Sequence, residues 1–161
     1  MEEVRFKELQ ALKKRAYAAF AAGGVMDVPN VDWQAHDPIA LAFAGDAYYS
    51  LFLRHCLVDT GIPNVQVLHS LAAEFVSAKA QAYVYRHLKE RLDEQEQDVC
   101  RRARNAYSQA PKSASVAEYH DATALEALVG YLYLSGRQER LDQIMEWALA
   151  GTKEYCSENH E

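Results

Sequence analysis

The stretch LAFAGDAYYSLFLR, residues 41–54, decides the fold of this 161-residue chain and points to its chemistry. Apolar residues recur on every side of a helix drawn through it, so we expect a helix that is buried all round. Asp46 is the only charged residue before the final arginine, and it directly follows Gly45. A glycine inside a helix costs about 1 kcal/mol relative to alanine, which indicates close approach of another backbone or of a ligand.

A second stretch, ATALEALVGYLYL at residues 122–134, repeats the pattern. Glu126 is its only charged residue, and Gly130 lies one helical turn later on the same face. Burying an unpaired carboxylate is so unfavourable that the group either finds a cation or takes up a proton. Neither stretch offers a cation within one turn of its acid. We therefore expect Asp46 and Glu126 to converge on a bound metal ion.

A structural role for these acids is the alternative at this point. A lone carboxylate in an apolar helix can cap a neighbouring helix or form an ion pair with a distant arginine. Two such acids, each beside a glycine inside its helix, favour the metal site over this alternative.

The hydrophobic pattern is helical along the whole chain and indicates no strand. The expected helices, separated by glycine, proline and N-cap residues, cover about residues 4–20, 37–58, 64–92, 94–106, 116–134 and 137–155. Five of the seven glycines fall at the ends of these helices or in turns: Gly23, Gly24, Gly61, Gly136 and Gly151. The predicted fold class is all-α, with one helical domain over residues 36–156, a helical extension over 1–35 and a tail over 157–161.

Composition and cysteine usage indicate a cytoplasmic protein. The chain is 50% hydrophobic and 25% charged, which is ordinary for a globular domain. Its three cysteines are odd in number and far apart, so they form neither a disulfide framework nor a zinc-ligand spacing, and a reducing compartment is expected. Acidic residues at positions 2 and 3 argue against a secretory signal, and no apolar run approaches the roughly 18 residues of a membrane span.

The net charge of −6 argues against a nucleic-acid partner, but one local stretch has the opposite sign. No acidic residue occurs from 99 to 117, and the candidate RNA-binding residues of this stretch are Arg101, Arg102, Arg104, Asn105 and Lys112. Double-stranded RNA is recognised mainly by shape through such phosphate and 2′-hydroxyl contacts. Lys79 is a weaker candidate. The alternative is a solvated helix end whose cations complement the helix dipole.

Four ordered motifs resemble the ribonuclease III family. The segments at 41–54 and 122–134 are similar to its signature helix and to its second acidic motif, in which Glu-Ala-Leu precedes a glycine. FVSAKAQA at 75–82 and RRARNAYSQAPK at 101–112 are similar to the Mini-III branch, which has the catalytic domain without a double-stranded-RNA-binding domain. The resemblance extends from residue 37 to about 155 and leaves residues 1–35 unexplained.

The resemblance implies an all-α endoribonuclease that acts as a homodimer on double-stranded RNA and produces 5′-phosphate ends. It implies one Mg²⁺-dependent site per subunit, with Asp46 and Glu126 as the metal-binding acids. For the Mini-III branch it implies the precursor of large-subunit (23S) ribosomal RNA as the substrate. Ala42 and Thr123 stand where full-length ribonuclease III has a Glu and an Asp, so each site holds fewer charged ligands. The Mini-III branch shares these losses.

Two rival interpretations remain. His120-Asp121 is the dipeptide of helical HD-type phosphohydrolases, with His55, His69 and His87 as further ligands, but this leaves Asp46 and Glu126 unexplained. The other rival is a helical RNA-binding or ribosome-assembly factor that has lost catalysis. The isolated acids at 46 and 126 argue against it, because an inactive relative has no need of them.

Overall fold

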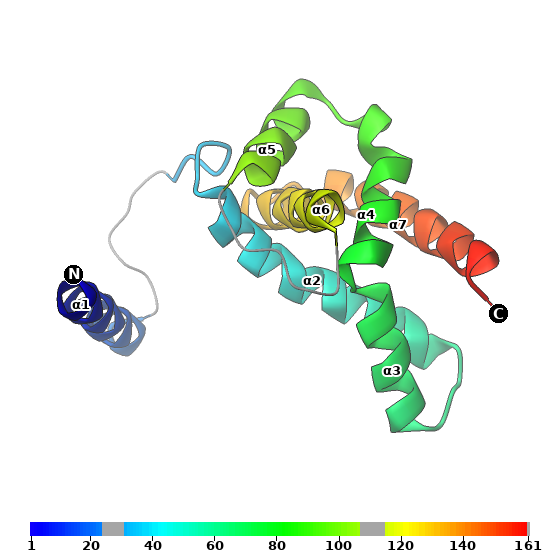
Figure 1. Cartoon of the computed structure of the whole chain (residues 1–161), viewed down its shortest axis with the longest axis horizontal. Helices are drawn as coiled ribbons and strands as arrows, with labels where there is room; N and C mark the ends of the chain where they lie inside the picture. The colour runs from blue at the N-terminus through cyan, green and yellow to red at the C-terminus, as the bar shows by residue number, and fades with distance from the viewer. Residues whose placement is uncertain (24–30, 107–114, 161) are drawn as a thin grey trace. The chain divides into compact units, whose positions relative to one another are not determined.

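Every regular element in the residues that the structure describes, 1–23, 31–106 and 115–160, is helical, which confirms the all-α prediction (Figure 1). The structure is a computed structural model. Its elements are α1 (Glu2–Ala21), α2 (Pro38–Asp59), α3 (Val65–Phe75), α4 (Ala78–Leu88), the short 3₁₀ helix η1 (Lys89–Arg91), α5 (Glu94–Asn105), α6 (Val116–Leu134) and α7 (Gln138–Glu158). None of the helices described is long and apolar enough to cross a bilayer.

Side-chain caps fix where the two acid-bearing helices begin. Asp37 accepts a hydrogen bond from the Ile39 amide at 3.0 Å, with Pro38 in the first turn of α2. Ser115 and Glu118 form a capping box at the start of α6. Both satisfy amide groups that a helix start leaves unpaired. The predicted first residues of these helices are therefore confirmed.

The core is built around α6. From Asp121 to Leu132 every residue of this helix is buried except Glu126. Helices α2, α4, α5 and α7 all contact α6 (Figure 1). The expectation that a helix apolar on every side is buried on every side holds for α6. It is wrong for α2 within one chain, because Phe43 is 84% exposed and Leu51 is 68% exposed.

The structure corrects two details of the predicted helices. The stretch predicted as one helix over 64–92 is broken, because Ser77 ends α3 and caps α4 by accepting a hydrogen bond from the Ala80 amide at 3.2 Å. Gly151 was expected at a helix end but is buried inside α7. A Cβ there would lie 3.4 Å from both the Val84 Cα and the His87 ring, so the glycine allows α4 and α7 to pack closely.

The chain divides into two compact units, Met1–Asp32 and Trp33–Glu161. The first contains α1, which has no buried residue and is followed by Gly23 at a φ of 121°, a conformation that glycine adopts readily. Part of the segment between the first two predicted helices, residues 24–30, lies outside the described residues. The assignment of residues 1–35 as an extension and of 157–161 as a tail stays a prediction, although α7 continues to Glu158.

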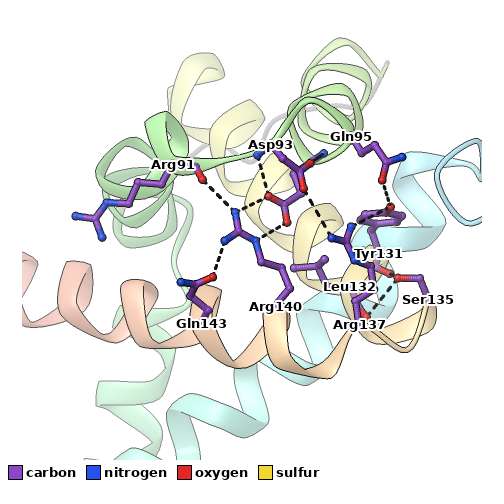
Figure 2. A network of polar contacts seen from close by, with 10 residues as sticks. Arg91, Asp93, Gln95, Tyr131, Leu132, Ser135, Arg137, Arg140 and Gln143 are labelled. Carbon is purple, nitrogen blue, oxygen red and sulfur yellow. Dashed lines mark hydrogen bonds and ion pairs between the residues drawn. The ribbon is translucent and has the colours of Figure 1, made fainter.

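A buried ion pair joins α5 to α7 (Figure 2). Glu96 is 0% exposed, and its carboxylate accepts hydrogen bonds from Arg140 Nε at 2.8 Å and Nη2 at 2.7 Å. Arg140 also donates to the Arg91 carbonyl and to Gln143, so all three of its guanidinium nitrogens are bonded. Glu96 in turn accepts from the Asp93 amide in a capping box. This network keeps a buried charge fully paired.

Candidate active site

Two glycines bring the backbones of α2 and α6 into direct contact. A Cβ on Gly45 would lie 1.7 Å from the Glu126 carbonyl oxygen, and a Cβ on Gly130 would lie 1.8 Å from the Leu41 carbonyl oxygen. Real Cβ atoms never approach that closely, so no other residue fits at either position without moving the helices apart. The expectation that glycine inside these helices marks close approach of another backbone is confirmed.

This crossing brings the two lone acids together. Asp46 follows Gly45 on α2, and Glu126 lies one turn before Gly130 on α6. Asp46 is exposed, whereas Glu126 is the one residue of the buried part of α6 that reaches solvent. Burial raises the pKa of Glu126 to about 8, and the Asp46 carboxylate adds to the shift through its negative charge and a shared hydrogen bond. The site is therefore a pair of carboxyl groups at the surface of the core that repel each other when both are ionised.

The next question is whether a cation of the described residues compensates these acids. Among the described residues, neither carboxylate forms an ion pair with a lysine, arginine or histidine. A divalent cation would remove the repulsion, and hard ions such as Mg²⁺ prefer carboxylate oxygens and need only one or two of them beside their waters. The donor set thus fits Mg²⁺. The described part of the chain holds no group of three His, Cys, Asp or Glu side chains that could bind a metal.

The basic residues predicted to bind RNA lie mostly at the end of α5, and acids of the protein engage three of them. Arg101 and Arg102 both form ion pairs with Asp98, and Arg102 also donates to the His36 carbonyl at 3.2 Å. Arg104 Nε lies 3.0 Å from Asp121 Oδ1. These pairings do not exclude phosphate contacts, because guanidinium groups keep further donors. The other candidates are Asn105, exposed at the end of α5, Lys79, exposed in the first turn of α4, and Lys112, which lies outside the described residues.

Sequence analysis missed the acidic partners of these arginines. Asp98 lies just before the acid-free stretch 99–117, at helical i+3 and i+4 spacing from Arg101 and Arg102. That spacing is the signal that could have revealed the pairing.

Asp121, the acid of the HD dipeptide, has a structural partner at each oxygen. It is 6% exposed, and besides Arg104 it contacts Arg86, whose Nε donates to Oδ2 at 2.7 Å. The histidines of that interpretation do not converge on it. His55 pairs with Asp59, and His87 pairs with Glu154. The arrangement supports no HD-type site.

Comparison with known proteins agrees with this geometry. The ribonuclease III domain family matches residues 39–137, which include both acids and both glycines of the crossing. The chain belongs to the ribonuclease III family. It is 51% identical over 112 residues to the Mini-ribonuclease 3 of Symbiobacterium thermophilum, an alignment that covers 69% of this chain and 86% of that protein. With the Mini-ribonuclease 3 of Brevibacillus brevis the identity is 47%, over 71% and 86% of the two chains.

The fold is shared with a solved structure. A crystal structure of a protein from Fusobacterium nucleatum matches with a TM-score of 0.69 and 33% identity, over 76% of this chain and 98% of that one. Together these findings identify the chain as an endoribonuclease of the Mini-ribonuclease 3 branch, as its sequence motifs indicated. They leave α1 outside the family match.

Proposed function

We propose that this endoribonuclease cleaves double-stranded RNA in a Mg²⁺-dependent reaction at Asp46 and Glu126. One observation carries the proposal: the Gly45–Gly130 crossing holds two carboxyl groups together, and no cation among the described residues pairs with them. A structural acid would have a partner, as Glu96 and Asp121 do. Family membership supports the same pair, because both acids lie in the matched region.

The two acids would bind the ion through carboxylate oxygens, which requires Glu126 to lose its proton when metal arrives. When bound, the ion would lower the pKa of a water molecule and offset the charge that builds up on the phosphate. In the hydrolysis, a water oxygen bonds to phosphorus as the bond to the 3′ oxygen breaks. The water's proton goes to solvent and the 3′ oxygen takes one up, which leaves a 5′-phosphate and a 3′-hydroxyl.

We also propose that the enzyme is a homodimer. Four exposed apolar side chains follow one face of α2, namely Ile39, Phe43, Leu51 and Val58. Exposed apolar side chains that gather on one face of a helix are typical of interaction surfaces. A second copy that covers this face would explain why the helix is apolar all round. Sedimentation at micromolar concentration should then give about twice the chain mass of 18.2 kDa, and an active monomer would contradict the dimer without touching the catalytic proposal.

For the natural substrate we propose the precursor of large-subunit (23S) ribosomal RNA, in the cytoplasm. The support is the resemblance to the Mini-III branch and the three free cysteines, which suit a reducing compartment. Deletion of the gene should leave this precursor with unprocessed ends, visible by primer extension, and restored processing by the wild-type gene but not by a Glu126→Gln gene is the control.

Cleavage of a labelled RNA duplex tests the proposed reaction. We expect cutting with Mg²⁺, none with EDTA, and no cutting of a matched single strand. An enzyme that binds duplex RNA but never cuts it would point instead to a binding or assembly factor. Equal cutting in EDTA would remove the metal from the mechanism.

A further inference from the structure

Asp121 holds two arginines from different helices on one buried carboxylate. Arg86 lies in the last turn of α4 and Arg104 in the last turn of α5, and each directs its Nε at a separate oxygen of Asp121, at 2.7 and 3.0 Å. The carboxylate is 8% exposed, whereas each arginine side chain is 48% exposed. The buried acid therefore fixes the stems of two guanidinium groups whose outer parts face water.

The charge of this cluster is unbalanced. Two guanidinium groups share one carboxylate, and no other acid among the described residues pairs with either arginine. Arg140 is the useful contrast, since all of its guanidinium nitrogens are bonded within the protein. The Nη groups of Arg86 and Arg104, in contrast, donate to no acceptor among the described residues. The cluster keeps a net positive charge and free donors on a chain whose net charge is −6.

We propose that Arg86 and Arg104, positioned by Asp121, form a clamp for a phosphate of the RNA backbone. Guanidinium groups match phosphate oxygens with paired donors, and a side chain that is already anchored loses less conformational freedom on binding. Arg104 is a candidate from the sequence alone, whereas the roles of Arg86 and Asp121 emerge only from the fold. The inference rests on the proposed duplex-RNA substrate.

The cluster lies close enough to the active site for one RNA molecule to reach both. Asp121 and Glu126 are five residues apart on α6, which corresponds to about 7.5 Å along the helix axis. The two side chains leave α6 on different sides, Glu126 towards α2 and Asp121 towards α4 and α5. The clamp would therefore hold a phosphate of the RNA backbone near the scissile phosphate, but not the scissile phosphate itself. Arg86 extends the predicted RNA-binding surface from α5 to α4.

Binding of uncut duplex RNA, measured in EDTA at several salt concentrations, tests the clamp without relying on catalysis. Arg86→Ala should lower the slope of the log–log salt plot by a little under one unit, since one phosphate contact is lost. Its affinity deficit should then be roughly three-fold larger at 50 mM than at 200 mM salt. Arg86→Lys should keep the slope and bind more weakly. Lys153→Ala removes an exposed charge elsewhere and should leave the slope unchanged.

Arg86→Gln guards against a loss of folding, because its amide can still donate to Asp121 while the charge is gone. The slope of its log–log salt plot should fall by the same amount as that of Arg86→Ala. Melting temperatures are recorded for both variants. An unchanged slope in a folded Arg86→Gln protein overturns the clamp. A wild-type chain that binds duplex RNA with an Arg86-dependent slope but does not cut it overturns the nuclease proposal alone. If the wild type binds no duplex RNA, the proposed substrate is wrong.

Discussion

Glu96 and Glu126 are both glutamates of core helices, but their surroundings are opposite. At the junction of α5 and α7, Glu96 is fully buried, and its two oxygens are bonded to Arg140 and to a backbone amide (Figure 2). At the crossing of α2 and α6, Glu126 is half-buried and faces a second carboxylate instead of a cation. The first arrangement stabilises the folded chain, and the second makes it less stable without a ligand.

The contrast teaches that burial alone does not mark a functional acid. Asp121 is also buried, and its two arginine partners neutralise it. What sets Glu126 apart is that its charged neighbour is a second carboxylate, Asp46, which together with burial raises the Glu126 pKa. Two results would contradict this contrast: evidence that Glu126 stabilises the fold, or evidence that Glu96 takes part in catalysis.

The largest effect is expected from Asp46→Asn and Glu126→Gln, which keep shape and remove charge. Cleavage should fall roughly a thousand-fold or more, because a bound ion supplies several kcal/mol of transition-state stabilisation and each 1.4 kcal/mol is worth a factor of ten. The melting temperature in EDTA should hold or rise, since the carboxylates no longer repel each other. Cleavage rates and melting curves measured on the same preparations distinguish a catalytic from a structural role of the two acids. A folded Glu126→Gln enzyme that cuts duplex RNA at wild-type rate would refute the mechanism.

Glu96→Gln should have the opposite signature. It leaves Arg140 without its carboxylate, and removing one partner of a buried ion pair costs about 3 kcal/mol of unfolding free energy. Urea unfolding should show this loss, while the cleavage rate per folded molecule stays near wild type. A large fall in that rate with an unchanged fold would place Glu96 in the catalytic machinery and end the comparison.

The pH dependence of stability should report the raised pKa of Glu126. In the metal-free protein, burial and Asp46 raise the pKa of Glu126 from its ordinary 4.5 to about 8, so the folded state holds a proton that the unfolded state has lost. Stability is then highest below pH 4.5 and declines as the pH rises to 8, by an amount on the order of 5 kcal/mol from this group. Glu126→Gln in EDTA should flatten this decline. Equal pH profiles for both proteins would show that Glu126 titrates normally.

The smallest effect on stability is expected at the exposed pair Arg101–Asp98. Arg101→Ala should leave the melting temperature essentially unchanged, because surface ion pairs contribute little. Its effect should appear in RNA binding, where the salt slope falls by a little under one unit if Arg101 contacts phosphate. Asp98→Asn is the control, since it breaks the pairs with Arg101 and Arg102 and keeps both cations. An unchanged slope in Arg101→Ala would place the RNA elsewhere.

The sequence by itself determined much of the fold and singled out the candidate pair of acids. Caps, prolines and apolar runs are local signals, so the starts of α2, α5 and α6 followed from them. Asp46 and Glu126 could be singled out because an isolated charge beside a glycine in an apolar helix is itself a local anomaly. The break at Ser77 was missed, since its signal is a single serine within an otherwise helical pattern.

The tertiary structure decided which charges are neutralised and where helices touch. Gly45 and Gly130 had to be seen facing each other's backbones before the acids could be placed together, and Gly151 was misplaced because its partner helix lies more than 60 residues away. The pairing of Asp121 with Arg86 and Arg104, like that of Glu96 with Arg140, joins residues on different helices. Sequence spacing carries no information about such partners, because Coulomb energy and hydrogen bonding depend on distance in space.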